Sequence, residues 1–448
     1  MLQLIRNNIP RVREAFDENI KTLMKPCSHP DAIIKLEVDK SKLKPMKQYP
    51  IEVAYRLYVD TQIEEWLKEG VIKEAPPREI FCSPLWTVPK RNLDGTIDKS
   101  TRRVCLDARR LNEALVNMDN FPVPVIRDIF ANLQGAKIFS EIDIRQAYTQ
   151  FPVEVESQQY LGFTWRNKAY CFIRAIFGLR FMTSRFQRVM KSITQGISNV
   201  EIYVDNIIIF SKTLDEHIDT IVKVIILFTK WGLTIKEEKC KLGLDEIRML
   251  GHLINAMGIR IDPNKYEMID NLKIPRTGLE LESILGLTNY FRMFLAQYSK
   301  IAAPLELIRK EKVLVWKSEH QQALELLKTG IKNAGILCYP DFEEPFHLAT
   351  DASYSGLGAV LFQKEGKQDK IIECVSRALT ESEQNYSATK LELAGVVFAL
   401  KRFRTYLIQR PFTLYTDHSA LVSLFKAKFE KNLLTNTWFE TIMDFITL

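Results

Sequence analysis

One nine-residue run, Ile202 to Phe210 (IYVDNIIIF), constrains the fold of this chain more than any other segment. Most of its residues are β-branched or aromatic, which is typical of buried strands, and the polar pair Asp205-Asn206 interrupts them. We therefore predict two short strands joined by a tight Asp-Asn turn. Such a turn would hold a carboxylate at a fixed point of a rigid sheet. A plain hairpin remains the alternative, because Asp-Asn is acceptable turn chemistry.

Length and composition set the frame for this hairpin. With 448 residues and roughly 150 residues per domain, about three domains are expected. The chain is 46% apolar and 26% charged, which is ordinary for a soluble globular protein. No apolar stretch reaches the roughly 18 residues of a membrane span, and the charged start does not resemble a signal peptide. We expect no membrane association and an intracellular location, in a cytoplasmic particle or the nucleus.

The cysteines, the histidines and the net charge limit which metal sites, disulfides and partners can be expected. The seven cysteines are scattered without a CxxC pair and the six histidines are equally dispersed, so neither a zinc site nor a disulfide framework is implied. The net charge of +7 is compatible with a polyanionic partner, although many proteins with such a charge bind none.

A second acidic residue lies in an apolar strand. Residues 137 to 155 read KIFSEIDIRQAYTQFPVEV, which places Asp143 at the end of a predicted strand. A hydrogen-bonded cap is the plain interpretation. Together with Asp205, however, Asp143 suggests two carboxylates that converge on a hard cation. Mg²⁺ is commonly held by one or two carboxylates and substrate phosphates, as nucleotidyl transfer requires.

A basic hairpin precedes these acids. Residues 86–89 read as a strand, 92–98 as a turn with Asp-Gly, and 103–106 as the returning strand. The hairpin carries five cations: Lys90, Arg91, Lys99, Arg102 and Arg103. A phosphate-gripping ribbon and a solvated charged loop are both open. The lysine-rich turn at 236–241 has the same two interpretations. Upstream of the hairpin, a helix is expected at about 51–69, with Val53, Leu57, Ile63 and Leu67 as its apolar stripe.

The order of several motifs adds a resemblance to a known family. SPLWTVPK, RRVCLDARRLN, FSEIDIRQAYTQFPV, FGL followed by RFQ, YVDNIIIFS and LGHLINAMGIRIDPNK occur in this order. From about residue 40 onward the chain resembles the reverse transcriptase of gypsy-type LTR retrotransposon Pol polyproteins. The resemblance implies an α+β fold, a right-hand polymerase with fingers, palm and thumb, followed by an RNase H-like α/β domain. It implies a connector at 1–40, fingers and palm at 41–265, thumb and connection at 266–344, and the RNase H-like domain at 345–448.

The resemblance also implies roles for single residues. Asp143 and Asp205 correspond to the metal-binding aspartates, which in this family hold two ions, Mg²⁺ or Mn²⁺. Arg103 resembles the arginine that grips the incoming triphosphate, and Lys90 is a weaker candidate for the same role. Tyr148 resembles the side chain that excludes a ribose 2′-OH. The substrate-binding set is completed by Phe177 and Gly178 of the FGL motif, and the implied partners are an RNA template, a DNA primer, their hybrid and dNTPs.

Two departures from the family pattern predict an impaired enzyme. Asn206 stands where the family has a third aspartate, so the site lacks one negative charge. At an effective dielectric near 20 a charge pair about 4 Å apart is worth roughly 4 kcal/mol, and about 1.4 kcal/mol is tenfold in rate, so a loss of two to three decades or more is expected. The bulky residues Arg180, Phe181, Met182 and Arg185 stand where small ones are usual, and we expect them to block part of the pocket. The alternatives are a non-catalytic nucleic-acid-binding relic and a nuclease without polymerase activity.

The last part of the chain carries three further acids. Residues 275–310 predict a helical thumb-like unit, with Arg292 and Lys300 free to contact duplex backbone. Beyond it, TDAS, the KLEL helix and TDHSAL occur in the order of an RNase H domain, and Asp351, Glu392 and Asp417 correspond to its metal-binding acids. Each alone could be a cap or a surface group. A last strand at 445–448, with no fourth acid available, predicts an incomplete domain with weak or absent ribonuclease H activity.

Overall fold

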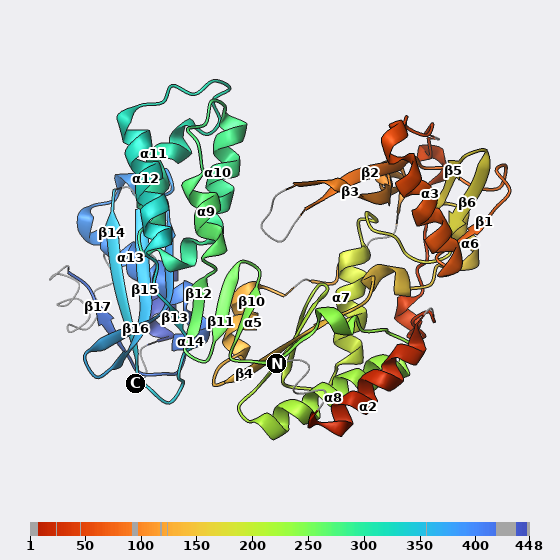
Figure 1. The fold of residues 1–448 in the computed structure, drawn as a ribbon. Coiled ribbons are helices and arrows are strands. Elements are labelled where there is room, and N and C mark those ends of the chain that lie inside the picture. Colours follow the sequence, from red (N-terminus) through yellow and green to blue (C-terminus); the bar gives the residue numbers. More distant parts are fainter. Residues whose placement is uncertain are drawn as a thin grey trace. The chain divides into compact units, whose positions relative to one another are not determined.

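The computed structural model describes residues 8–23, 25–44, 46–91, 97–116, 119–122, 124–354, 356–417 and 436–445, with backbone only at 90–91, 97–101, 126–127, 436–437 and 439 (Figure 1). The chain forms two compact units. The first unit comprises Met1–Ile129 and Gly135–Ile247, and the second comprises Phe130–Gln134 and Arg248–Leu448. The finer domain boundaries expected at 40, 265 and 344 stay a prediction.

Three sheets with their helices make up the described part of the first unit. Their orders are β1-β6-β5, β2-β3 and β7-β8-β4-β9. The strands are β1 (Ile72–Glu74), β2 (Leu85–Arg91), β3 (Ile97–Leu106), β4 (Ile138–Asp143), β5 (Gly162–Trp165), β6 (Lys168–Phe172), β7 (Val200–Tyr203), β8 (Asn206–Ser211) and β9 (Lys241–Leu244). The helices are α2 (Pro10–Asn19), α3 (Val53–Lys68), α4 (Arg109–Ala114), α5 (Ile126–Asn132, which continues into the second unit), α6 (Val155–Gln158), α7 (Met182–Ile193) and α8 (Leu214–Lys230).

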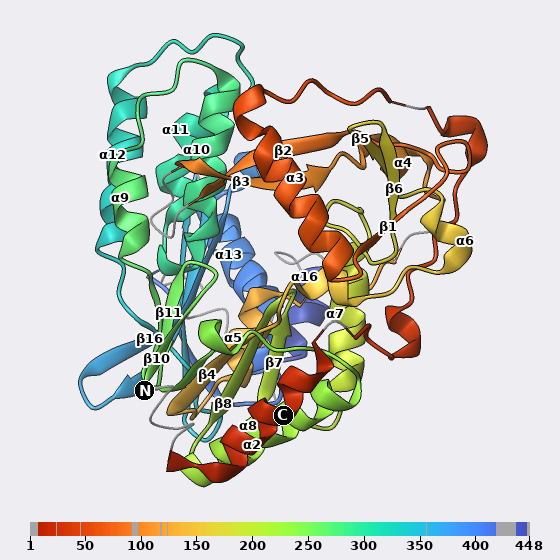
Figure 2. The same cartoon turned by 45° about the vertical axis from the view of Figure 1, so that its right-hand side comes forward.

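The central sheet of this unit is built on β8, which pairs antiparallel with both β7 and β4. Ile207 to Phe210 are all buried, because β8 has strand neighbours at both edges and packing on its faces. Helix α8 contacts β8 and β4, and α2 lies along α8 (Figure 2). Asp215 and Glu216 in the first turn of α8 and Lys230 in its last turn suit the helix dipole. The sheet is therefore a rigid platform for residues at its strand ends.

The turn of the central hairpin differs from the prediction. Tyr203 pairs directly with Asn206, so the two turn residues are Val204 and Asp205, and Asn206 is the first residue of β8. Val204 has a φ of +57°, which is unusual for a β-branched residue. The predicted Asp-Asn turn was thus wrong by one residue. The two strands themselves are confirmed.

Two other predicted elements of the first unit are present. The basic hairpin is β2-β3, paired from Leu85–Leu106 to Arg91–Ile97, and its turn at 92–96 lies outside the described residues. The first helix is α3, but its buried side chains are Val59, Ile63 and Trp66. Val53 and Leu57 are 75% and 72% exposed, so most of the expected apolar stripe was wrong.

The second unit contains two four-stranded sheets, one of which begins at the unit boundary. Their orders are β10-β11-β12-β13 and β16-β15-β14-β17. The strands are β10 (Glu246–Met249), β11 (His252–Asn255), β12 (Gly258–Ile261), β13 (Leu337–Cys338), β14 (Phe346–Ser353), β15 (Gly356–Glu365), β16 (Gln368–Arg377) and β17 (Phe412–Tyr415). The helices are α9 (Asn264–Asp270), α10 (Gly278–Tyr290), α11 (Tyr298–Ile308), α12 (Ser318–Lys332), α13 (Ala388–Arg402), α14 (Arg404–Leu407) and α16 (Asn436–Met443).

The β16-β15-β14-β17 sheet of the second unit has the expected order of elements. Strands β14, β15 and β16 form an antiparallel meander, and β17 returns parallel to β14 after α13. Helix α13 packs on β14 and β15 through a core that includes Leu393, Val397 and Leu400. Residues 436–443 are helical and Phe445 lies in a turn, so the strand expected from residue 445 is contradicted there, and 446–448 lie outside the described residues. Asp444 accepts a hydrogen bond of 2.6 Å from Arg404.

The mixture of helices and mixed sheets confirms the α+β class. Within the described ranges, no helix combines the length and apolarity that a bilayer crossing requires.

Candidate active site

The two acids of the central sheet lie on neighbouring backbone positions of two paired strands. Asp143 is the last residue of β4 and pairs directly with Asn206 of β8. Asp205 precedes Asn206 at the tip of the turn, where its side chain is exposed. The antiparallel register between β4 and β8 therefore brings the two carboxylates and the amide to one edge of the sheet. This juxtaposition was expected from the sequence.

A buried glutamine, which the sequence analysis did not single out, holds this turn. Gln187 on α7 is fully buried. Its Oε1 accepts the N–H of Val204 at 2.7 Å, and its Nε2 donates to the carbonyl of Ile202 at 2.8 Å. These two bonds fix the backbone on the residues before Asp205, including the left-handed Val204. The only sequence signal was its place in the RFQ motif.

Charge and backbone contacts also fix Asp143. Burial raises its pKa above the ordinary value, nearby Lys239 and Lys236 oppose this rise, and Asp205 adds to it. Its carbonyl accepts the N–H of Lys236 at 2.8 Å, and its N–H points at the sulfur of buried Cys240, 3.5 Å away. The lysine-rich turn thus lies beside the acid, a placement that the sequence did not predict. Lys241 in the same turn is paired with Glu141 instead.

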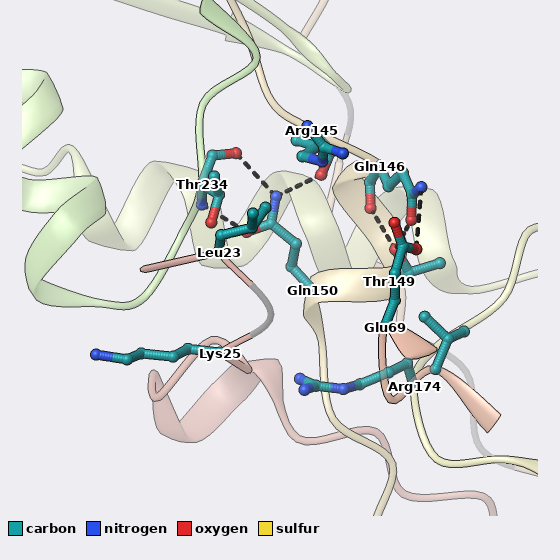
Figure 3. A pocket seen from close by; sticks show the side chains of 10 residues that line it. Leu23, Lys25, Glu69, Arg145, Gln146, Thr149, Gln150, Arg174 and Thr234 are labelled. Carbon is teal, nitrogen blue, oxygen red and sulfur yellow. Dashed lines mark hydrogen bonds between the residues drawn. The ribbon is translucent and has the colours of Figure 1, made fainter. Parts of the chain in front are cut away.

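The segment after Asp143 is held by a network of side chains around a pocket (Figure 3). Gln146 has a φ of +42°, and Thr149 donates to its carbonyl at 2.9 Å. The amide of Gln150 donates to the carbonyls of Arg145 and Thr234 and accepts the N–H of Thr234 at 2.7 Å. These contacts fix a short 3₁₀ turn, Ala147–Gln150. Tyr148 is part of this turn, so its position follows from the network.

Tyr148 packs among aromatic side chains. It is only 9% exposed, and its ring centroid lies 4.8 Å from that of Phe177 and 5.5 Å from that of Phe186. Burial raises its pKa, and the charge of Asp205 contributes to this rise. Tyr148 therefore lies within electrostatic range of the acidic turn while part of its ring belongs to the core.

The FGL motif presents an exposed aromatic ring. Phe177 is 48% exposed and Gly178 has a φ of +97°, a conformation that favours glycine. Asn112 ties this loop to α4: its Nδ2 donates to the carbonyl of Gly178 at 2.7 Å, and its Oδ1 accepts the N–H of Arg180 at 3.0 Å. The loop that carries Phe177 is therefore anchored on both sides of Leu179.

Two arginines of the basic hairpin have different surroundings. Arg103 on β3 is exposed, whereas the guanidinium of Arg102 lies 3.8 Å from the ring centroid of Tyr55. The backbone of Lys90 pairs with Asp98, but its side chain lies outside the described residues. Of the two candidate triphosphate ligands, only Arg103 has a described side chain, and that side chain is exposed.

A second group of acids lies in the second unit. Asp351 is on β14, Glu392 is on α13 and Asp417 follows β17. Glu392 is 8% exposed. Burial raises its pKa to about 7, and the charges of Asp417 and Asp351 add to the rise. Glu392 is thus within electrostatic range of both Asp351 and Asp417.

Two family models match the chain over these regions. Residues 88–254 match reverse transcriptase (RNA-dependent DNA polymerase), and residues 316–414 match the RNase H-like domain found in reverse transcriptase. The chain belongs to the reverse transcriptase family. The first model describes an RNA-dependent DNA polymerase domain and the second an RNase H-like domain.

Known Pol polyproteins confirm the gypsy-type resemblance. The chain is 36% identical over 379 residues to the retrovirus-related Pol polyprotein from transposon 297 of Drosophila melanogaster, and 33% identical over 394 residues to that from transposon gypsy of the same fly. Each match covers 84% of this chain but only 35% and 37% of those polyproteins. The chain thus spans about a third of the length of these relatives.

Solved structures confirm the fold class. The foamy viral protease-reverse transcriptase dRH in complex with double-stranded DNA matches with a TM-score of 0.78 and 25% identity, over 93% of this chain and 71% of that one. The foamy viral protease-reverse transcriptase in complex with an RNA/DNA hybrid matches with a TM-score of 0.70 and 24% identity, over 93% of this chain and 55% of that one. The latter similarity concerns the fold alone.

Both candidate sites of this chain have donors that suit divalent cations. The family generally depends on such ions. In the described ranges, no three His, Cys, Asp or Glu side chains are gathered closely enough to hold an ion as they stand. Mg²⁺ usually needs only one or two carboxylates, since phosphates and water complete its shell. The Oε2 atom of Glu392 is buried without a hydrogen-bond partner among the described residues, and two more carboxylates are near it. This chemistry fits a cation.

The bulky residues after the FGL motif have structural partners. Phe181 and Met182 are 2% and 1% exposed and belong to the core. Arg185 pairs with Asp119 at 2.8 Å, and Arg180 donates to the carbonyl of Leu115. Core packing and pairing account for these side chains, and a block of the pocket stays a prediction.

Proposed function

We propose that this chain is an RNA-directed DNA polymerase that extends a DNA primer on an RNA template with dNTPs by two-metal nucleotidyl transfer. The observation that carries the proposal is the pairing of Asp143 with Asn206, next to Asp205, at one edge of a rigid sheet. Two carboxylates at one strand end suit a cation that also binds substrate phosphates. The family membership supports the reaction class.

Each residue of the proposed site has a distinct task. Asp143 and Asp205 would hold two Mg²⁺ or Mn²⁺ ions, whose positive charge lowers the pKa of the primer 3′-OH and neutralises the triphosphate. Arg103, with Lys90 as a weaker candidate, would grip the triphosphate. Tyr148, on its fixed 3₁₀ turn, would contact the sugar of the incoming nucleotide. Phe177 and Gly178 would line the substrate pocket.

The proposed partners are an RNA template, a DNA primer, their hybrid and dNTPs. A similar foamy viral protein was solved on double-stranded DNA, which supports a nucleic-acid duplex as the partner of this chain. A polymerase that consumes dNTPs works where these are present, so the proposal places it inside the cell, in a cytoplasmic particle or the nucleus.

The proposed polymerase is slow. Asn206 supplies an oxygen but no charge at the position that pairs with Asp143. The missing charge would cost about two to three decades in rate, by the estimate of roughly 4 kcal/mol for one close charge pair. A scaffold that binds nucleic acid without chemistry is the alternative.

Primer extension tests the proposal. The chain and its Asp143→Asn variant would be assayed on an RNA template with Mg²⁺ and with Mn²⁺, and binding of the hybrid would be measured in parallel. We expect slow extension by the chain, none by Asp143→Asn, and hybrid affinities within about twofold of each other, since the loss removes a metal ligand rather than a binding surface. Equal extension by both proteins would refute the assigned role. Binding without extension by either would favour the scaffold.

A second activity, hydrolysis of the RNA strand of a hybrid, is proposed for the second unit. The buried Oε2 atom of Glu392 beside Asp351 and Asp417 favours it, and the match to the RNase H-like domain supports it. These acids would hold two ions that activate water and stabilise the leaving oxygen. Cleavage of a labelled hybrid by the Asp143→Asn chain, and its loss in the further variant Glu392→Gln, would separate this activity from the polymerase. Cleavage unchanged by Glu392→Gln would rule the site out.

A further inference from the structure

The segment 292–299, which leads into α11 and includes its first two residues, crosses the β16-β15-β14-β17 sheet of the second unit at one row of residues. Asp351 on β14 pairs with Gly358 on β15, and Gly358 pairs with Ser376 on β16. These three residues therefore form a line across the sheet that starts at a proposed metal ligand. Helix α11 contacts both β15 and β16.

The segment is anchored at the far end of this row. The N–H and the Oγ of Ser299 each lie 3.0 Å from the Oγ of Ser376. The guanidinium of Arg292 donates to the carbonyl of Ser376. The sequence suggested that Arg292 contacts duplex backbone, but in the structure its guanidinium binds a carbonyl of the same unit. Two residues of the segment thus converge on Ser376.

The residue in the middle of the row is Gly358, and its lack of a side chain leaves room for the segment. A Cβ atom added to Gly358 would lie 3.1 Å from the carbonyl oxygen of Ala296. Any other residue at 358 would therefore press against the segment. The absence of a side chain here lets the backbone at 296 pass directly over the sheet.

The segment reaches the near end of the row through Gln297. The Nε2 atom of Gln297 donates to Oδ2 of Asp351 at 2.9 Å. The amide is neutral, so it orients the carboxylate without competing for a cation by charge. A donor on one carboxylate oxygen leaves the other for an ion, and such outer contacts are known to orient metal ligands.

We propose that Gln297 is a positioning residue for the nuclease site: it fixes the carboxylate of Asp351 for a divalent cation, so that the segment 292–299 completes this site. The inference rests on the proposed ribonuclease H function of Asp351, Glu392 and Asp417. It adds a residue 54 positions before Asp351 in the chain, outside the matched RNase H-like region, which begins at residue 316.

Binding of Mn²⁺ to the full chain tests this role without relying on activity. In a background with Asp143→Asn and Asp205→Asn, which silences the first site, free Mn²⁺ would be measured by electron paramagnetic resonance. We expect Gln297→Met, which keeps the length of the side chain and loses the donor, to weaken Mn²⁺ binding roughly tenfold, as outer-contact substitutions do. Its thermal unfolding should match that of the background.

Three controls separate positioning from structure. Gln384→Met makes the same change at an exposed glutamine of this unit and should leave affinity unchanged. Ser299→Ala removes an anchor of the segment but retains Gln297, so its effect on affinity should be smaller than that of Gln297→Met. Gly358→Ala, which pushes against Ala296, should weaken Mn²⁺ binding in the same direction as Gln297→Met.

The outcomes distinguish the two levels of the proposal. No Mn²⁺ binding in the background, or binding unaffected by Asp351→Asn, would overturn the proposed nuclease site itself. Loss of binding in Asp351→Asn with full binding in Gln297→Met would overturn only the role of Gln297. Equal weakening in Ser299→Ala and Gln297→Met, with lowered unfolding temperatures, would assign Gln297 to folding and overturn positioning.

Discussion

Asp143 and Asn206 face each other as a directly paired couple across β4 and β8. One partner is a carboxylate whose pKa is raised by burial, and the other is an amide with no charge. The pairing places the uncharged side chain of Asn206 on the strand position opposite Asp143, a proposed metal ligand. It also makes the consequence of adding a negative charge at this position testable.

Asn206→Asp should raise the rate of primer extension by about 100-fold to 1000-fold, because one close charge is worth roughly 4 kcal/mol. Extension on an RNA template with Mg²⁺ measures it. Asn167→Asp adds the same charge at an exposed turn of the same unit and should change nothing. A rate that stays low in Asn206→Asp would shift the defect to the Arg180–Arg185 segment.

Gln187→Ala should lower the stability of the first unit by about 2–4 kcal/mol, because the N–H of Val204 and the carbonyl of Ile202 lose their partner inside the core. Urea unfolding measures it. Primer extension by the folded variant should fall as well, since Asp205 follows the released backbone. Gln159→Ala, at an exposed glutamine, serves as the control. Unchanged stability would mean that the hairpin turn does not depend on the hydrogen bonds of Gln187.

Tyr148→Val should loosen discrimination against ribonucleotides by at least about tenfold, the equivalent of 1.4 kcal/mol, because the smaller side chain leaves room for a 2′-OH. The ratio of kcat/KM for dNTP and rNTP measures it. Tyr148→Phe keeps the ring between Phe177 and Phe186 and should retain discrimination. Equal ratios in all three proteins would reduce Tyr148 to core packing.

Arg103→Ala should lower kcat/KM for dNTPs by about tenfold or more, because a charge-assisted contact to phosphate is worth roughly 1.5–3 kcal/mol. Steady-state kinetics with varied dNTP measures it. Arg102→Ala is the matched control: Arg102 stacks on Tyr55, so its loss should affect stability rather than kcat/KM. If Arg102→Ala lowered kcat/KM and Arg103→Ala lowered only stability, Arg102 would be the triphosphate ligand instead.

Glu392→Gln should change how the stability of the second unit depends on pH. The pKa of Glu392 is raised from 4.5 to about 7, so between these values the unfolded chain releases a proton that the folded chain retains. Stability therefore falls as pH rises through this window, by roughly 3 kcal/mol in total. Denaturant unfolding should show that the free energy of unfolding of the variant rises relative to that of the parent at pH 8 but not at pH 4.

Two observations check the interpretation of this pH effect. Glu381→Gln, an exposed carboxyl of the same unit, should leave the pH dependence unchanged. Mg²⁺ at pH 8 should stabilise the parent but not Glu392→Gln, because a bound cation favours the charged carboxylate. A parent whose stability is flat from pH 4 to pH 8 would contradict the raised pKa.

The sequence by itself indicated the strands of the central sheet and the acids of both proposed sites. Alternating and continuous apolar runs predicted β4, β7 and β8, because strand formation depends on local side-chain patterns. The ordered motifs indicated Asp143, Asp205, Asp351, Glu392 and Asp417 by resemblance. These features are local in the chain, so a reader of the sequence can find them without knowing which elements touch.

Tertiary structure alone decided which side chains face which. The hairpin turn lies at Val204-Asp205 because Tyr203 pairs with Asn206, and Gln187 in the middle of α7 accepts the N–H of Val204. Helix α3 buries Trp66 rather than Leu57, since the neighbouring sheet selects the covered face. Gln297 reaches Asp351 because Gly358 lets the backbone pass. Apart from the hairpin pair, each of these contacts joins residues distant in sequence, and their energies depend on packing that no local pattern encodes.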